Sequence, residues 1–188
     1  MAKRVFFSFH YQDVIDFRAN VVRLHKTTKD DNAGYFDASI WETAKKTGEL
    51  ALKRLINREL QNTSVTAVLI GSETYNRRWV RYEIMRSMFK GNKLIGIHIN
   101  SITGKDQKTR RLGPNPFEYL GIQYSDDGTK ASLFEYKNGK WVGYGDMNDY
   151  ELSQAVKNNK GRFFKLSHFY KTYDWIRDDG YNNFPKWI

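Results

Sequence analysis

The chain has 188 residues and a formal net charge of +10, and 40% of its residues are hydrophobic. That length allows one hydrophobic core with a small appendage but leaves little room for two full domains. The charge favours anionic partners, yet the lysines and arginines are scattered from Lys3 to Lys186, which argues against nucleic-acid binding. The absence of cysteine excludes disulfides, zinc ribbons and thiol nucleophiles.

The chain shows no membrane or export signal. Its longest apolar runs, such as residues 65–71, are too short to span a bilayer, so we expect no membrane partner. The opening sequence MAKRVFFSFHYQD has two positive charges but only a five-residue apolar stretch and no small-residue cleavage site, unlike a signal peptide. Together with the missing cysteines, this predicts a cytoplasmic protein.

The first third of the chain predicts a strand, a helix and a short second strand. Residues 4–9, RVFFSF, form an apolar run that suits a strand buried on both faces. Asp13 is a candidate N-cap for a helix. Tyr35 and Phe36 make a very short strand candidate. The apolar face of the helix would comprise Val14, Phe17, Val21 and Leu24.

Three further elements extend the same alternation. Residues 49–60 predict an amphipathic helix with an apolar face of Leu52, Leu55, Ile56 and Leu60. Residues 64–72, SVTAVLIGS, are typical of a central parallel strand. A third helix would bury Val80, Ile84 and Met88, and residues 93–99 predict the next strand. Strands alternating with helices indicate an α/β fold, a parallel sheet flanked by helices in a flavodoxin-like order.

The pattern changes after Ile99. Pro114 and Pro116 rule out a long helix, and LFEYKNGKWVGY predicts a β-hairpin around Asn138-Gly139. We expect a short helix to start at Asp149 and the aromatic-rich tail to pack back on the core. The expected division is a core over residues 1–125 and a hairpin with a C-terminal extension over residues 126–188.

Several familiar sites are missing from the sequence. No G-x-G-x-x-G follows the first strand and there is no P-loop motif, so no tightly held cofactor is expected. No metal site is expected either, because no ligand spacing links the four histidines, which are His10, His25, His98 and His168.

Chemistry-bearing side chains gather where the predicted strands end, and ligands of open parallel sheets bind beyond those ends. Trp79 and Glu83 are four residues apart and share one face of the third helix. An aromatic plane, hydroxyls and one acid would therefore converge on a cleft. The other members, in chain order, are Ser8, Phe9, His10, Asp37, Ser72 and Tyr75.

A plainer interpretation of the helix residues stays open. On spacing alone, Glu83 is more often an ion-pair partner of Arg78 or Arg86 on a solvated helix, worth a few tenths of a kcal/mol. Trp79 is likewise more often a core aromatic than a stacking platform.

These residues resemble the TIR domains. RVFFSFHYQD is similar to their opening box, GYFD falls where their second strand lies, and LIGSETYNRRWVRYEI is similar to their third strand and following helix. The match covers about residues 3–100, and within the family the chain resembles the TIR-like ThsB proteins of bacterial Thoeris anti-phage systems. The loop after Asp37 lacks the Arg-Asp and Pro-Gly of many receptor-type TIR domains. A serine, an aromatic, a tryptophan and a glutamate of the family match Ser72, Tyr75, Trp79 and Glu83.

The resemblance implies a flavodoxin-like fold and an activity on NAD, as substrate rather than as cofactor. The nicotinamide glycosidic bond is cleaved, and the ADP-ribose part is cyclised into a signal that activates an NAD-depleting effector protein. In such enzymes the glutamate that matches Glu83 is catalytic. TIR sites are often completed by a neighbouring copy, so self-association is expected, with a phage-derived trigger as one candidate switch.

One carboxylate suffices for this chemistry, because nicotinamide in NAD is already cationic and leaves as a neutral molecule without a general acid. Glu83 would stabilise the oxocarbenium-like charge. Trp79 or Phe9 would stack an aromatic base, and backbone amides with Ser8 would hold the diphosphate.

Two other functions stay open on the sequence. A non-catalytic TIR adaptor would act by self-association or by docking a partner, and it predicts sensitivity to charge reversal at positions such as Arg81 rather than at Glu83. A basic nucleic-acid binder would lose affinity steeply as the salt concentration rises.

Overall fold

The computed structural model describes residues 4–26, 43 and 46–188, and the chain divides into two units. Unit 1 comprises Met1–Gly113 and Thr172–Ile188, and unit 2 comprises Pro114–Lys171. The chain thus leaves the first unit twelve residues before the boundary expected at residue 125, and it returns at Thr172. The returning strand is three residues long, too short to show a sequence pattern.

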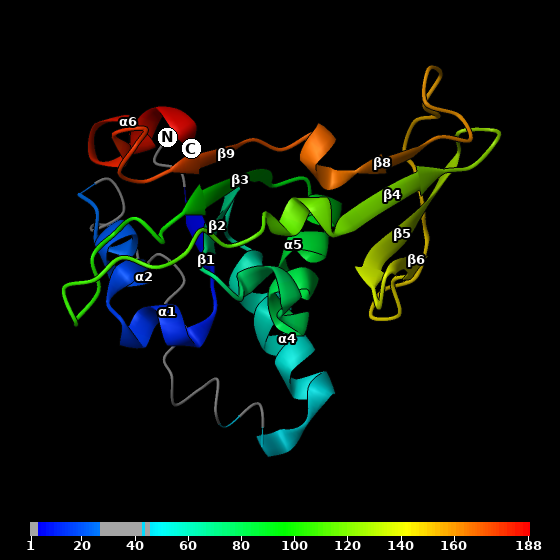
Figure 1. Ribbon diagram of the computed structural model, residues 1–188. Helices are drawn as coiled ribbons and strands as arrows, with labels where there is room; N and C mark the ends of the chain where they lie inside the picture. Colours follow the sequence, from blue (N-terminus) through cyan, green and yellow to red (C-terminus); the bar gives the residue numbers. More distant parts are fainter. Residues whose placement is uncertain (1–3, 27–42, 44–45) are drawn as a thin grey trace. The chain divides into compact units, whose positions relative to one another are not determined.

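Unit 1 contains a four-stranded parallel sheet (Figure 1). Its strands, in spatial order, are β1 (Val5–Ser8), β2 (Val65–Ile70), β3 (Lys93–His98) and β9 (Thr172–Asp174). This is the predicted flavodoxin-like order from its first strand onward. The second-strand candidate, Tyr35 and Phe36, lies outside the described residues.

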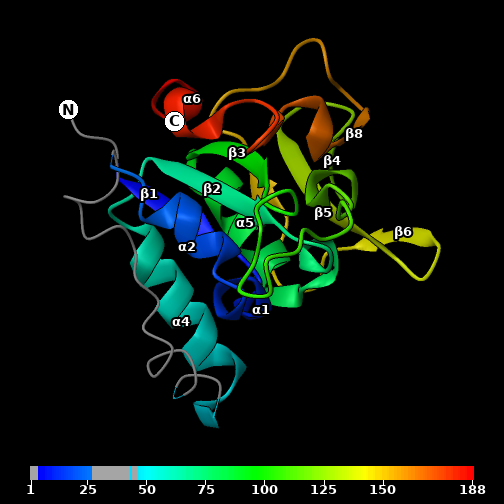
Figure 2. The same ribbon diagram turned by 60° about the vertical axis from the view of Figure 1, so that its left-hand side comes forward.

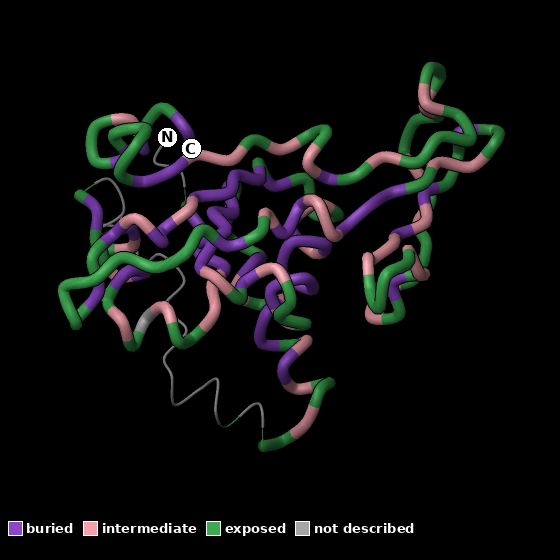
Figure 3. The backbone as a smooth tube through the Cα atoms, viewed as in Figure 1, coloured by how far each residue is buried: buried purple, intermediate pink, exposed green. Residues whose placement is uncertain are grey.

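Helices cover both faces of this sheet (Figure 2). On one side, α4 (Glu49–Leu60) and α5 (Arg78–Lys90) pack together, and α5 lies against the first three strands. On the other side, α2 (Arg18–Arg23) and α6 (Gly180–Trp187) share a hydrophobic cluster with alternate residues of the strands. Figure 3 shows the buried backbone following these strands. The members of the cluster include Val5, Phe7, Val65, Ala67, Ala19, Val22 and Phe184.

The two later helices confirm the predicted pattern. Helix α4 has the predicted bounds and buries all four predicted apolar residues. Helix α5 buries Val80 and Ile84, whereas Met88 in its last turns is only half-buried. Among the described residues, no helix is long and apolar enough to cross a membrane.

The predicted face of the first helix is wrong. The chain turns at Phe17, whose φ is 63°, and this splits the helix into α1 (Tyr11–Ile15) and α2. Phe17, Val21 and Leu24 are about half exposed, while Arg18 is buried with Ala19 and Val22. The break rotates α2 so that the guanidinium of Arg18 reaches the buried carbonyl oxygen of Ile102.

Unit 2 contains an antiparallel sheet in the order β6, β5, β4, β8, with β7 paired to β5. The strands are β4 (Leu120–Tyr124), β5 (Lys130–Lys137), β6 (Lys140–Gly143), β7 (Tyr150–Glu151) and β8 (Phe163–Lys165). The predicted hairpin is confirmed, with positive φ at Asn138 and Gly139. The predicted helix at Asp149 is wrong, because Ser132 on β5 donates a hydrogen bond to Asp149 and the next residues form β7.

Candidate active site

Glu83 lies in the second turn of α5 and faces the end of β1. Its side chain is buried, with 5% exposed, and the hydroxyl of Ser8 donates a hydrogen bond of 2.5 Å to its Oε2 atom. The two residues are 75 apart in sequence and meet because α5 packs across β1. A buried acid held by one hydroxyl is not the solvated counter-ion of a basic helix.

The arginines beside Glu83 are paired elsewhere. Arg78 forms a two-point contact with Glu49 of α4, and Arg86 donates to the side-chain oxygen of Asn57 at 2.8 Å. In the described part of the chain, no cation pairs with Glu83. The ion-pair interpretation of Glu83 is therefore wrong.

Burial controls the protonation of this acid. Desolvation raises the pKa of Glu83 from 4.5 to about 8, and the hydrogen bond from Ser8 opposes that rise. The carboxyl group is thus mostly protonated at neutral pH in the free protein. A cation placed beside it would favour the carboxylate, so the site is suited to a positively charged ligand.

The turn before α5 fixes the start of the helix. It contains the 3-10 helix η1 (Thr74–Asn76), in which the buried hydroxyl of Thr74 accepts a hydrogen bond from the backbone N–H of Gly71 at 2.9 Å. Arg81 is buried on α5, and its Nε donates to the carbonyl oxygen of Tyr75 at 3.0 Å. Arg81 is therefore part of the scaffold of the site and not of a docking surface.

Asp13 is a half-buried acid that the sequence identified only as a helix cap. Burial raises the pKa of Asp13 to about 6, and the nearby Arg18 is the main influence that lowers it. Its Oδ2 atom is buried without a hydrogen-bond partner. The carboxyl group rests against Gly71, so α1 packs on the turn that follows β2. Its place just after the first predicted strand, residues 4–9, was the signal available in the sequence.

We expect Gly71→Ala to destabilise the protein, because the new Cβ would lie 2.3 Å from Oδ1 of Asp13. The cost should be about 1–3 kcal/mol in urea unfolding. The double variant with Asp13→Ala lacks the clash. Its loss of unfolding free energy should therefore be smaller than the sum of the losses in the two single variants. Strictly additive effects would contradict this contact.

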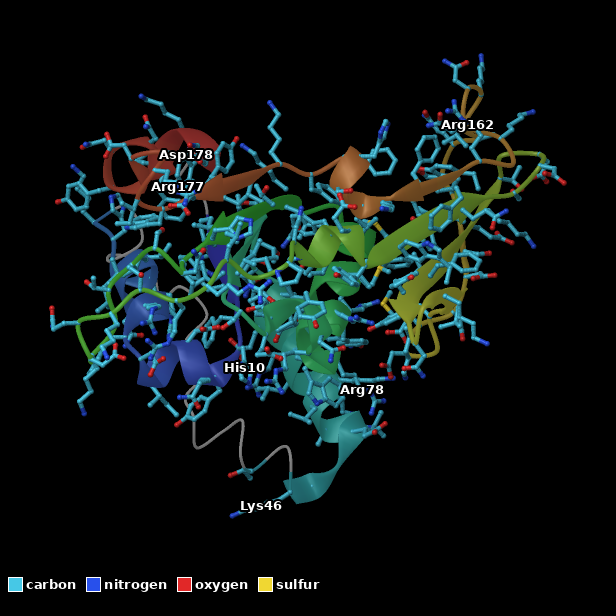
Figure 4. The ribbon with its side chains drawn as sticks, viewed as in Figure 1. His10, Lys46, Arg78, Arg162, Arg177 and Asp178 are labelled. Carbon is cyan, nitrogen blue, oxygen red and sulfur yellow. The ribbon has the colours of Figure 1, made fainter. Side chains whose placement is uncertain are left out.

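The remaining predicted residues do not all converge on Glu83. His10, labelled in Figure 4, is half-buried, and burial followed by the charge of Arg77 lowers the pKa of its imidazole. Phe9 packs against the cluster on the α2 face, with the guanidinium of Arg23 4.8 Å from its ring centroid. Because side chains alternate along a strand, Phe9 and Ser8 point to opposite faces of the sheet.

Three further predicted residues, Ser72, Tyr75 and Trp79, lie between the end of β2 and Glu83. Trp79 is half-buried one turn before Glu83, with Arg78 over its ring and Tyr82 at its edge. Ser72 and Tyr75 are half-buried in the turn that leads to the helix. Asp37 lies outside the described residues. Among the residues that are described, no three acidic or histidine side chains gather to hold a metal ion.

Removing the Ser8 hydroxyl should change the protonation of Glu83. In Ser8→Ala the pKa of Glu83 should rise further, since the one hydrogen bond that opposes the effect of burial is lost. Any activity that needs the carboxylate should fall about tenfold at pH 7 and recover at higher pH. Ser87→Ala is the matched control, because Ser87 is another buried α5 hydroxyl but bonds to Thr66. Equal pH profiles for the two variants would contradict this role of Ser8.

Comparison with known proteins shows the family of the chain. The sequence model of the family described as "Thoeris protein ThsB, TIR-like domain" matches residues 6–103. A protein of Bacillus cereus (strain MSX-D12), named "Putative cyclic ADP-D-ribose synthase ThsB1", is 61% identical over 191 residues, which span 100% of both chains. The parallel sheet flanked by helices fits a TIR-like fold. The chain therefore belongs to the ThsB family of TIR-like proteins from Thoeris systems.

Proposed function

We propose that this protein breaks the bond between nicotinamide and ribose in NAD and cyclises the remaining ADP-ribose into a diffusible signal. The observation that carries the proposal is the buried carboxyl of Glu83, bonded to Ser8 at the carboxyl edge of a parallel sheet. The name of the Bacillus cereus relative, a cyclic ADP-D-ribose synthase, supports it.

The raised pKa of Glu83 suits a substrate whose positive charge moves from the nicotinamide ring to the ribose during the reaction. The cationic nicotinamide ring favours the carboxylate when NAD binds. As the C–N bond breaks, its electron pair leaves with nicotinamide, and positive charge develops at the ribose carbon. The carboxylate stabilises this charge in a site from which water is largely excluded.

Ring closure needs a nucleophile of the same molecule held closer than water. That nucleophile forms the new bond to the ribose carbon. A hydroxyl nucleophile passes its proton to Glu83, which is suited to accept it because its pKa is about 8. Half-buried Trp79, one turn away, is placed to stack an aromatic base of the substrate.

The proposed product acts on a separate effector protein, and a neighbouring copy of the chain completes the site by self-association. The test is chromatography with mass detection after purified protein is incubated with NAD. We expect free nicotinamide together with a product one water lighter than ADP-ribose. ADP-ribose as the only product would contradict cyclisation, and intact NAD would favour the adaptor function.

A further inference from the structure

A basic segment runs between the end of β3 and the end of unit 1. Residues 103–112, here called the basic strap, are exposed apart from Gly104 and lie between two buried residues, Ile102 and Gly113 (Figure 1, green trace leaving β3). The strap carries one carboxylate, Asp106. Its four cations are Lys105, Lys108, Arg110 and Arg111.

Arg18 anchors the outer part of the strap. Arg18 is buried, with about 1% of the residue exposed. Its guanidinium donates to the carbonyl oxygens of Ile102 at 3.0 Å and Lys108 at 2.7 Å. Gly104 packs directly on this group, since a Cβ there would lie 2.3 Å from the nearest guanidinium nitrogen. A buried cation that bonds the carbonyl just before the strap and one within it holds the strap against α2.

The inner part of the strap returns to the carboxyl ends of β3 and β2. The backbone N–H of Arg110 donates to the carbonyl oxygen of Asn100, just past the end of β3, at 2.8 Å. Gly113 then lies against the backbone of Gly71 and Ser72, where an added Cβ would be 1.9 Å from the Gly71 oxygen. The strap thus ends on the loop that leads to Glu83, at the carboxyl edge where such sheets bind ligands.

Two carboxylates in or beside the strap are already paired. Asp16 accepts from Arg18 at 2.7 Å, and Asp106 accepts from Arg110 at 3.0 Å. In the described part of the chain, no carboxylate pairs with the remaining strap cations. These are the exposed side chains of Lys105, Lys108 and Arg111.

The diphosphate of NAD needs a partner other than the one the sequence suggested. Ser8 was expected to help hold it, but Ser8 is fully buried and its hydroxyl is bonded to Glu83. We propose that the basic strap binds the diphosphate of the dinucleotide through Lys105, Lys108 and Arg111. This inference rests on the proposed function, because NAD supplies the two phosphate charges that these cations meet.

The test neutralises the strap and compares matched surface variants. In Lys105→Gln/Lys108→Gln/Arg111→Gln, the KM for NAD should rise about tenfold while kcat stays within about twofold, because the diphosphate is remote from the bond that breaks. An unchanged KM would overturn the proposal, as would an equal rise in the control. The control is Lys137→Gln/Lys140→Gln/Lys157→Gln, which removes the same charge from exposed positions of unit 2.

A binding measurement separates this inference from the proposed function. Calorimetry with ADP-ribose on the Glu83→Gln protein needs no turnover. We expect strap neutralisation to weaken ADP-ribose binding about tenfold and to leave binding of nicotinamide riboside, which has no phosphate, unchanged. If ADP-ribose binding depends on the strap but the wild type does not turn over NAD, diphosphate binding by the strap is supported and the proposed enzyme activity is contradicted. If the wild type turns over NAD but ADP-ribose binding does not depend on the strap, the enzyme activity is supported and the role of the strap is contradicted.

Discussion

Glu83→Gln should reduce NAD turnover at least about a thousandfold, because glutamine keeps the size of the side chain but cannot carry the negative charge that stabilises the transition state. The substitution should leave the fold intact, since Ser8 can donate to the amide oxygen in place of the carboxylate. The measurement is the rate of nicotinamide release at saturating NAD.

The matched control for that experiment is Glu151→Gln, which removes a carboxylate whose side chain is 85% exposed in unit 2. It should turn over NAD at the wild-type rate. Retained activity in Glu83→Gln would remove Glu83 from the mechanism. Equal losses in both variants would show that net charge, not this site, controls the rate.

The same substitution should also stabilise the protein in a pH-dependent way. The pKa of Glu83 is about 8 in the folded protein and near 4.5 when unfolded, so between these values the folded state binds more protons. The free energy of unfolding of the wild type therefore falls as the pH rises from 4.5 to 8. Below pH 4.5 the acid is protonated in both states and does not lower the free energy of unfolding.

Glu83→Gln removes the loss of stability that comes from ionising the buried carboxyl group. Near pH 4 the variant and the wild type should unfold alike, whereas at about pH 9 the variant should be more stable by a few kcal/mol and melt several degrees higher. Thermal unfolding at the two pH values measures the difference. A variant that is less stable than the wild type at the higher pH would contradict the burial of an uncompensated carboxyl group.

Local periodicity predicted the parts of the fold in which one face of a helix meets the sheet. Helix α4 follows its leucine and isoleucine spacing to the residue, and the continuous β-branched run gives β2. The first helix escaped prediction because a long-range contact decided its orientation. Arg18 is buried by bonds to carbonyls 84 and 90 residues away, and no local pattern signals such partners.

The site was predictable where it depended on sequence motifs and not where it depended on packing. The family spacing predicted a catalytic role for Glu83. Its partner Ser8 was assigned to the diphosphate, since the two residues meet only when α5 crosses β1. Phe9 was grouped with Ser8 although strand alternation separates them. Asp13 was overlooked because burial raises its pKa, and the contact of its carboxyl group with Gly71 joins a helix and a turn that are far apart in the sequence.

The buried environment of Arg81 also bears on the adaptor function. A charge reversal there would break its bond to the Tyr75 carbonyl and disturb the turn before α5, so loss of function in that variant would not identify a docking surface. An exposed arginine such as Arg54 on α4 is the appropriate position for that test.

The central claim is that a buried acid becomes the catalytic carboxylate when it ionises, and its most direct test is the pH dependence of kcat/KM for NAD. This parameter reports the ionisation of groups in the free enzyme. We predict that it rises about tenfold per pH unit below the pKa of Glu83, about 8, and levels off above it. A value of kcat/KM that is independent of pH from about 6 to about 9 would contradict the claim, because Glu83 would then be ionised throughout that range.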